Sequence, residues 1–166
     1  VTRYIVGGDR DDYGFLTYGV TESVDVGNYD REETAIFQVE EIFNPFNDLA
    51  IDIDLIPRSP SSTLNDLIGH AIGFVGSHEL GHALGGFHTD ATNLLIQIMD
   101  SGGGPFATQQ LWGLGLDGIY GTADDVDIDF GTDRYEPLEL LFLGQQDSAA
   151  TVAFGLSTGT RGGFVT

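Results

Sequence analysis

The chain has 166 residues, which is long enough for one domain with a buried core. Its 26 acidic and 6 basic residues give a formal net charge of -20, which argues against nucleic acid and anionic membranes as partners. The chain has no cysteine, which excludes disulfides, thiolate zinc sites and a cysteine nucleophile, and no apolar run long enough to cross a bilayer.

The first third of the chain predicts short strands. Residues 1–6 are typical of a strand inside a fold, not of a secretory signal. Residues 14–26 are rich in β-branched and aromatic side chains, which favours an extended conformation. Residues 34–39 favour a strand, although the acidic residues before them would also suit a helix start. Residues 50–56 alternate with period two and stop at Pro57, which predicts a half-buried strand.

A long helix is predicted from about Thr63 to Leu84. Apolar residues recur there at spacings of three and four, namely Leu64, Leu67, Ile68, Ala71, Ile72, Val75 and Leu80. Gly69, Gly73 and Gly76 weaken the helix by roughly 1 kcal/mol each relative to alanine, so we expect close packing on the sheet to compensate. The helix should end at Gly85-Gly86, where a left-handed cap is expected.

The last third of the chain is less regular. Between Met99 and Tyr135 it is rich in glycine and aspartate and shows little periodicity, and residues 146–154 predict a final helix. The order of elements indicates an α+β fold. We expect a small twisted mixed sheet backed by the long helix, and an irregular C-terminal part that ends in a helix.

Three of the four histidines lie in residues 78–90, which read HELGHALGGFHTD. His78 and His82 are four residues apart and share one helix face, so that their imidazoles can chelate one zinc ion. Glu79 stands beside the first ligand, where a carboxylate can act as general base on a water at the metal. Gly85 supplies a sharp turn, after which His88 returns as the third ligand.

These residues resemble the signature of the metzincin clan of zinc endopeptidases, in the pattern His78-Glu79-x-x-His82-x-x-Gly85-x-x-His88. The clan also has a methionine in a tight turn beneath the metal, and the single methionine of this chain is Met99. The wider chain, over about residues 1–156, resembles bacterial secreted matrixin-like peptidases. The resemblance includes residues 117–125 and 144–148.

The resemblance implies a zincin or metzincin-like fold and one metallopeptidase catalytic domain over residues 1–166. Its upper part would reach to about residue 85, and its lower part would begin at about residue 86. It implies that His78, His82 and His88 bind zinc, that Glu79 is the catalytic base, and that Met99 forms the Met-turn. The implied protein is a secreted bacterial monomer whose protein or peptide substrate pairs with an edge strand.

The chain departs from the family pattern at three places. Thr89 follows the third histidine where typical matrixins carry serine, and residue 101 is Ser101 where astacins and serralysins have a tyrosine ligand. The long helix that usually precedes the sheet has no candidate before residue 30, so we expect amino-terminal elements to be missing.

An acidic stretch downstream is a candidate calcium site. Five acidic residues fall at positions 1, 3, 5, 9 and 12 of a calcium-loop pattern, namely Asp125, Asp127, Asp129, Asp133 and Glu136. Phe130 occupies the sixth position, where an EF-hand needs glycine. Two interpretations remain: a looser calcium site, or a solvated acidic loop. The candidate calcium ligands are Asp117, Asp124, Asp125, Asp127, Asp129 and Asp133.

The sequence leaves the roles of several other residues, and a competing function, open. His70 is predicted to be a structural or surface histidine, and Asp90 either orients a ligand histidine or caps the turn. Met99 also suits an ordinary core position. The competing function is a non-catalytic extracellular binding or adhesion module that a metal stabilises. The presence of Glu79 argues against that module, because a structural zinc site needs no base.

Overall fold

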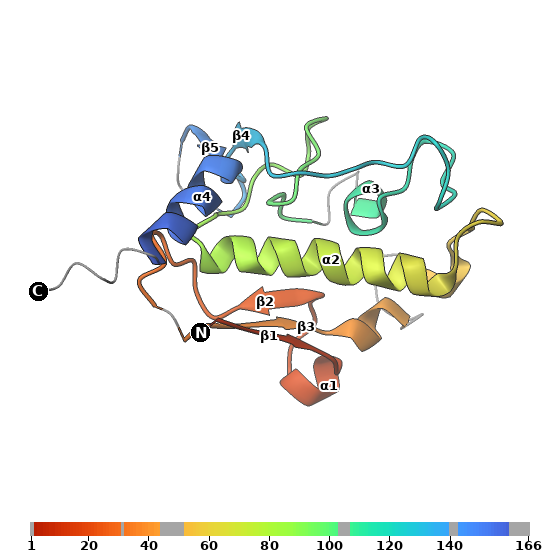
Figure 1. The fold of residues 1–166 in the computed structure, drawn as a ribbon, viewed down its shortest axis with the longest axis horizontal. Helices are drawn as coiled ribbons and strands as arrows, with labels where there is room; N and C mark the ends of the chain where they lie inside the picture. The colour runs from red at the N-terminus through yellow and green to blue at the C-terminus, as the bar shows by residue number, and fades with distance from the viewer. Residues whose placement is uncertain (1, 31, 44–51, 103–106, 140–142, 160–166) are drawn as a thin grey trace, which may run out of the picture.

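The computed structural model describes residues 2–30, 32–43, 52–102, 107–139 and 143–159. Within them, a long helix lies between a small sheet and an irregular C-terminal region (Figure 1). The fold is α+β, as the order of elements predicts. Parts of two predicted strands, at Val1 and residues 50–51, lie outside the described residues.

The sheet consists of three short strands in the order β1-β3-β2. β1 runs parallel to β3, and β2 runs antiparallel to it, so that the sheet is mixed as expected. β2 is therefore an edge strand. The strand bounds are Arg3–Val6 for β1, Gly19–Thr21 for β2 and Thr34–Phe37 for β3.

Helix α2, Leu64–Ala83, confirms the predicted long helix. Thr63 and Asp66 form a capping box at its start: the Thr63 side chain accepts from the Asp66 backbone, and the Asp66 side chain accepts from Thr63. Leu67, Ala71 and Val75 are buried at the spacing of one helix face. That face belongs to a core that also contains Phe37, Ile42, Ile53, Ile56 and Trp112.

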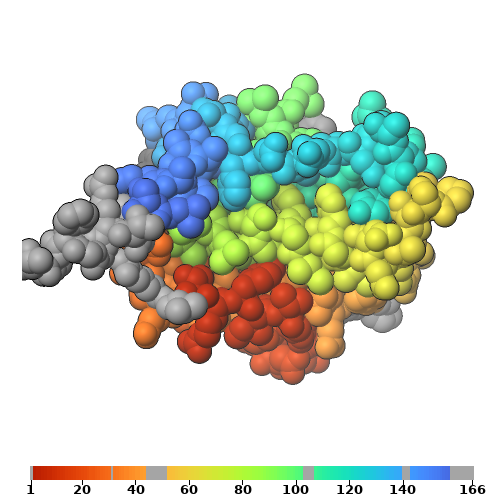
Figure 2. All heavy atoms as spheres, in the orientation of Figure 1, coloured from red at the N-terminus to blue at the C-terminus, as the bar shows by residue number. Residues whose placement is uncertain are grey.

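The C-terminal region covers the other side of α2. Figure 2 shows the N-terminal segments against one side of α2 and the blue-green chain against the opposite side. The elements there are α3 (Ala107–Trp112), β4 (Thr132–Arg134), β5 (Gln145–Asp147) and α4 (Ser148–Gly159). The sequence predicts a final helix over residues 146–154, and the structure begins that helix two residues later, after β5. Helix α3 was not predicted.

The prediction of a strand over residues 50–56 is wrong for the part that is described. Ile53–Leu55 form a 3-10 helix, in which the Asp52 side chain accepts a hydrogen bond from Asp54 N. Ile53 and Ile56 are buried, whereas Leu55 is 71% exposed. Burial at a spacing of three suits one face of a 3-10 helix, and the local cap of Asp52 competes with a strand ladder.

The long extended segment predicted over residues 14–26 is strand only at Gly19–Thr21. Gly14 caps the four-residue helix α1, Arg10–Tyr13, with a φ of 83°. After Thr21 the chain leaves the sheet, and Asp25 N donates to the carbonyl of His82 at 3.1 Å. This segment therefore gives the His82 carbonyl at the end of α2 a second donor, besides Gly85 N, instead of lengthening the strand.

Residues 34–39 are also divided between two elements. The predicted strand is confirmed at Thr34–Phe37, but Val39 begins a second 3-10 helix, Val39–Phe43. The only helix that the described residues form before residue 30 is the short helix α1. No helix in the described part of the chain is long and apolar enough to span a bilayer.

Candidate metal centre

Helix α2 presents two of the three clustered histidines. His78 and His82 lie one turn apart on the helix, and their ring centroids are 4.8 Å apart. Helix α2 ends at Ala83, one residue after His82. The chain is then free to bend back toward the two rings.

The bend after α2 depends on Gly85. Its φ is 98°, which side-chain-bearing residues rarely adopt, and a Cβ on it would lie 2.8 Å from Val26 Cα. Gly85 N donates to His82 O, and Gly86 N donates to Gly81 O, both at 2.8 Å. These bonds satisfy carbonyls at the helix end and fix the direction in which the chain leaves it.

The returning segment is tied to the turn that contains Met99. Thr89 N donates to Met99 O at 2.8 Å, and the Thr89 hydroxyl donates to Asp100 Oδ1 at 2.8 Å. Asp100 N donates to Gln97 O, which closes a tight turn around Ile98 and Met99. Thr89 thus connects the strand-like segment of His88 to this turn through both its backbone and its hydroxyl.

Met99 lies beneath the end of the helix and is fully buried. A Cβ on Gly81 would collide with the Met99 sulfur, and a Cβ on Gly86 would lie 3.2 Å from the Met99 methyl carbon. Gly81 directly precedes His82, and Gly86 follows it by four residues. The backbone on both sides of this histidine therefore packs against the Met99 side chain. The contacts of Met99 therefore indicate a packing role.

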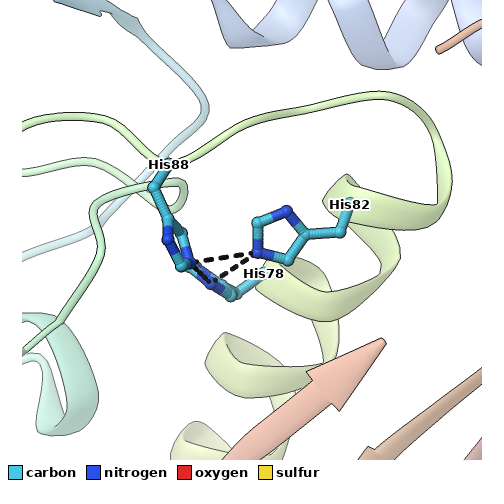
Figure 3. Close-up of side chains that lie close together, drawn as sticks. All are labelled: His78, His82 and His88. Carbon is cyan, nitrogen blue, oxygen red and sulfur yellow. Dashed lines mark hydrogen bonds between the residues drawn. The ribbon is translucent and has the colours of Figure 1, made fainter. Parts of the chain in front are cut away.

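The three imidazoles converge on one point, as Figure 3 shows. Their Nε2 atoms form a nearly equilateral triangle, with separations of 3.1 Å between His78 and His82 and 3.2 Å for the other two pairs. An ion that binds nitrogen at roughly 2.0–2.1 Å in tetrahedral geometry requires nitrogens about 3.3–3.4 Å apart. The observed triangle fits such an ion closely.

The opposite nitrogen of each ring faces a hydrogen-bond acceptor. His78 Nδ1 lies 2.6 Å from Ile98 O, and His82 Nδ1 lies 2.7 Å from Gly86 O. His88 Nδ1 contacts the Glu139 carboxylate. Each Nδ1 therefore carries the proton and donates it outward, so that in the neutral ring the Nε2 lone pair points into the cluster.

The surroundings of His78 and His82 favour neutral, ligand-competent rings. Burial and the neighbouring His82 and His88 hold the pKa of His78 well below its usual range. Burial and His88 lower the pKa of His82 to about 4. Three inward lone pairs repel one another unless a cation lies between them. Within the described residues, this triad is the group of histidine and acidic side chains that can hold a metal ion.

Glu79 lies beside the triad with its carboxylate held by the edge strand. The Thr21 hydroxyl lies 2.8 Å from Glu79 Oε2 and 2.7 Å from the Glu79 carbonyl oxygen. A Cβ on Gly19 would collide with the same carboxylate, so the absence of a side chain there makes room for it. Burial raises the pKa of Glu79 to about 7, although the hydrogen bond from Thr21 acts in the opposite direction.

Two cavities meet at Glu79 and the metal centre. One, of about 220 Å³, is lined by Tyr18, Phe74, Val75, Leu111 and Asp100 in addition to His78, Glu79 and His88. The other, of about 300 Å³, is lined by Val20, Thr21, Ser23 and Phe87 in addition to Glu79, His82 and His88. Gly19, at the start of the edge strand β2, borders both.

Three of the six candidate calcium ligands bond within their own loop. Asp117 Oδ1 accepts from Ile119 N, Asp124 accepts from Asp117 N and the Thr122 hydroxyl, and Asp125 accepts from Gly121 N. Asp133 is buried and accepts from Asn93 at 2.6 Å. The described residues do not bring three or more of the six aspartates into one group. Both interpretations of the acidic stretch, a calcium site and a solvated loop, stay predictions, and the bonds within the loop favour the second.

The structure distinguishes between the two readings of Asp90. Its side chain is fully buried and accepts from Thr92 N at 2.9 Å, from the Thr92 hydroxyl and from Arg134. Asp90 therefore caps the turn after the triad and anchors β4, whereas other groups orient the histidines. His70 lies outside the triad and packs edge-on against Tyr120, with 5.9 Å between ring centroids.

The sequence did not single out three residues that touch this centre: Thr21 at Glu79, Asp100 at Thr89, and Glu139 at His88. Asp100 had a usable signal, because it directly follows the single methionine. Thr21 and Glu139 had none, since they lie 58 and 51 residues from their partners. Only the folded chain brings them to the site.

Comparisons with models of known protein families, with curated proteins and with solved structures found no match. The functional inference for this chain therefore depends on its own residues and their geometry. Two features are central to it: the converging histidines, and the buried carboxylate held between two cavities.

Proposed function

We propose that this protein is a zinc-dependent endopeptidase of the metzincin clan, similar to the bacterial secreted matrixin-like enzymes. The observation that carries the proposal is the combination of the Nε2 triangle with the carboxylate of Glu79. The distances suit zinc, whose preferred ligands in such sites include neutral imidazoles. The proposed substrate is a protein or peptide, and the proposed location is outside the cell.

His78, His82 and His88 would hold the ion. Among the described residues only these three histidines form the metal-binding group, so one position of a tetrahedral ion is left for solvent or substrate. When bound, zinc supplies Lewis acidity, which lowers the pKa of a water and polarises the carbonyl of the peptide bond. The outward hydrogen bonds to Ile98 and Gly86 keep two of the ligand rings in the required tautomer.

Glu79 provides the general base. It takes a proton from the attacking water as the oxygen adds to the carbonyl carbon, and it delivers that proton to the amine nitrogen as the C–N bond breaks. Thr21 and Gly19 on β2 fix the position of the carboxylate. In the metal-free protein burial raises the pKa of this carboxylate to about 7, which makes it a stronger proton acceptor than an exposed glutamate.

The edge strand and the two cavities suit an extended substrate. Among the described residues β2 pairs on one side only, with β3, so a peptide can pair with its other side. A peptide along β2 would pass Gly19, which borders both cavities, with its scissile bond near Glu79. Backbone pairing of this kind makes recognition partly independent of sequence.

The experiment that tests the proposal compares Glu79→Gln with the parent protein. Glutamine keeps the size of the side chain but cannot act as base, so the initial rate on an unstructured protein substrate should fall at least 10²–10⁴-fold. Zinc content, determined on the same samples, should stay at about one per chain because Glu79 is not a ligand. Equal rates for both proteins would refute the role of Glu79. Zinc without hydrolysis in either protein would support the non-catalytic module.

A further inference from the structure

The three metal-facing histidines have unequal outer partners. The Nδ1 atoms of His78 and His82 donate to backbone carbonyls, at 2.6 Å and 2.7 Å. His88 Nδ1 instead contacts the carboxylate of Glu139, a side chain that is 47% exposed. His88 thus has the one ionic and solvent-exposed partner of the three.

We propose that Glu139 is a positioning residue for His88, which holds its ring in the metal-binding orientation and strengthens the affinity of the centre for zinc. The inference rests on the metal site of the proposed function, but not on peptide hydrolysis. A carboxylate that accepts the outward N–H of a ligand histidine fixes the tautomer of the ring and raises its basicity. Glu139 is aimed at the nitrogen that performs this task.

His88 depends on such a partner more than the helical histidines do. His78 and His82 project from a continuous helix, whereas His88 lies on the irregular segment after the turn at Gly85. Its side chain is 27% exposed, so packing restrains it only in part. The hydrogen bond from His88 Nδ1 to Glu139 therefore contributes more to the orientation of this ring than the corresponding bonds of His78 and His82 contribute to theirs.

The backbone around Glu139 is anchored to the same segment as His88. Glu136 N donates to His88 O at 3.1 Å, and Glu136 is itself buried. The Glu136 carboxylate accepts from the Ser101 hydroxyl at 3.1 Å and from Leu138 N at 3.0 Å. These bonds bring the chain to His88 three residues before Glu139, so that the carboxylate is placed by a fixed turn.

An ordinary exposed ion pair would have a different consequence. Surface pairs contribute little to stability, because water screens them and both side chains lose rotamer freedom. A pair of that kind would leave zinc affinity unchanged when it is removed. The positioning role predicts the reverse: zinc affinity changes, while the stability of the metal-free protein does not.

The experiment compares Glu139→Ala and Glu139→Gln with the parent protein and with Glu40→Gln as a matched control. Glu40 is exposed on the 3-10 helix Val39–Phe43 and lines neither cavity of the centre, so its variant removes the same charge elsewhere. The zinc dissociation constant is measured by competition with a chromophoric chelator. Urea unfolding of the metal-free proteins and the visible spectrum of the cobalt(II) forms are measured alongside.

We expect Glu139→Ala to raise the zinc dissociation constant about 10–100-fold, the usual cost of losing such an outer partner. The zinc dissociation constant of Glu139→Gln should lie between those of the parent and Glu139→Ala, because the amide oxygen still accepts a hydrogen bond but carries no charge. Glu40→Gln should match the parent. The cobalt spectrum should change in Glu139→Ala alone, and metal-free stability should be the same in all four proteins.

An unchanged zinc affinity and cobalt spectrum in Glu139→Ala would overturn the proposal. So would a loss of affinity that Glu40→Gln shows equally, since net charge would then be the cause. A parent protein that binds zinc but cleaves no peptide would refute the proposed endopeptidase and leave the role of Glu139 supported or overturned by the affinities alone.

Discussion

Two segments of this chain are dense in metal-ligating residues, and the structure uses them in opposite ways. In residues 78–88 the histidines give their Nδ1 protons to outer acceptors and turn their lone pairs toward one another. In residues 117–125 the aspartates accept hydrogen bonds from nearby backbone N–H groups of their own loop. Both segments have a high density of potential metal ligands in the sequence. Only in residues 78–88 do the free lone pairs converge on one point.

The physical cause is the geometry of the backbone. A helix holds residues four apart on one face, so side chains converge without local competition from the backbone. In a glycine-rich loop the backbone N–H groups are free, and short aspartate side chains bond to them first.

Replacing His82 with alanine should abolish tight zinc binding, because two ligands cannot close the site. His70→Ala is the matched control, since His70 lies on the same helix outside the triad. Elemental analysis after dialysis should give about one zinc per chain in the control and none in His82→Ala. With zinc at 1,000 times its dissociation constant, the control should also gain about 4.1 kcal/mol of stability. Equal zinc contents in the two variants would disprove the site.

Replacing Gly81 with alanine should lower the free energy of unfolding by about 1–3 kcal/mol, the usual cost of overpacking a core. The added Cβ would collide with the Met99 sulfur beneath the triad. Gly73→Ala is the control on the same helix, because nothing lies within 4 Å of its added Cβ. It should raise stability by about 0.5–1 kcal/mol. Urea denaturation measures both, and the same sign for both would contradict the packing on Met99.

Asp100 should make stability depend on pH. Burial raises its pKa from 3.8 to about 6, so the folded state keeps a proton that the unfolded state has already lost. The unfolding free energy should therefore fall as pH rises from about 4 to about 6 and then level off for this group. Asp100→Asn removes that slope.

The measurement for Asp100 is urea unfolding of metal-free parent and Asp100→Asn protein at several pH values. The histidines and other acids are common to both, so their contributions cancel in the difference. The stability of the parent relative to the variant should decline between about pH 4 and pH 6. A constant difference across that range would show that the Asp100 carboxyl titrates at its ordinary value.

The smallest effect concerns calcium and the aspartate-rich loop. Since Asp117, Asp124 and Asp125 bond within the loop, we expect calcium and magnesium at equal ionic strength to shift the melting temperature by the same small amount. A calcium site would instead add about 2.7 kcal/mol at a hundred-fold excess over its dissociation constant. A calcium-specific rise of that size, lost in Asp124→Asn, would show that the loop binds the ion.

The sequence by itself determined the long helix, the turn at Gly85 and the identity of the clustered histidines. All of these follow from spacing and local conformation over a few residues, which the chain encodes directly. The sequence was misleading at residues 52–56, where alternation suggested a strand but the cap of Asp52 and burial at a spacing of three favour a 3-10 helix.

Only the tertiary structure decided what surrounds the cluster. Thr21 reaches Glu79 from 58 residues away, and Glu139 reaches His88 from 51 residues away. Such contacts depend on how the sheet and the C-terminal region fold onto the two sides of α2, and no local pattern records them. Helix α3 was missed for a related reason: Leu111 and Trp112 are buried by packing against α2, although their neighbours show no helical period.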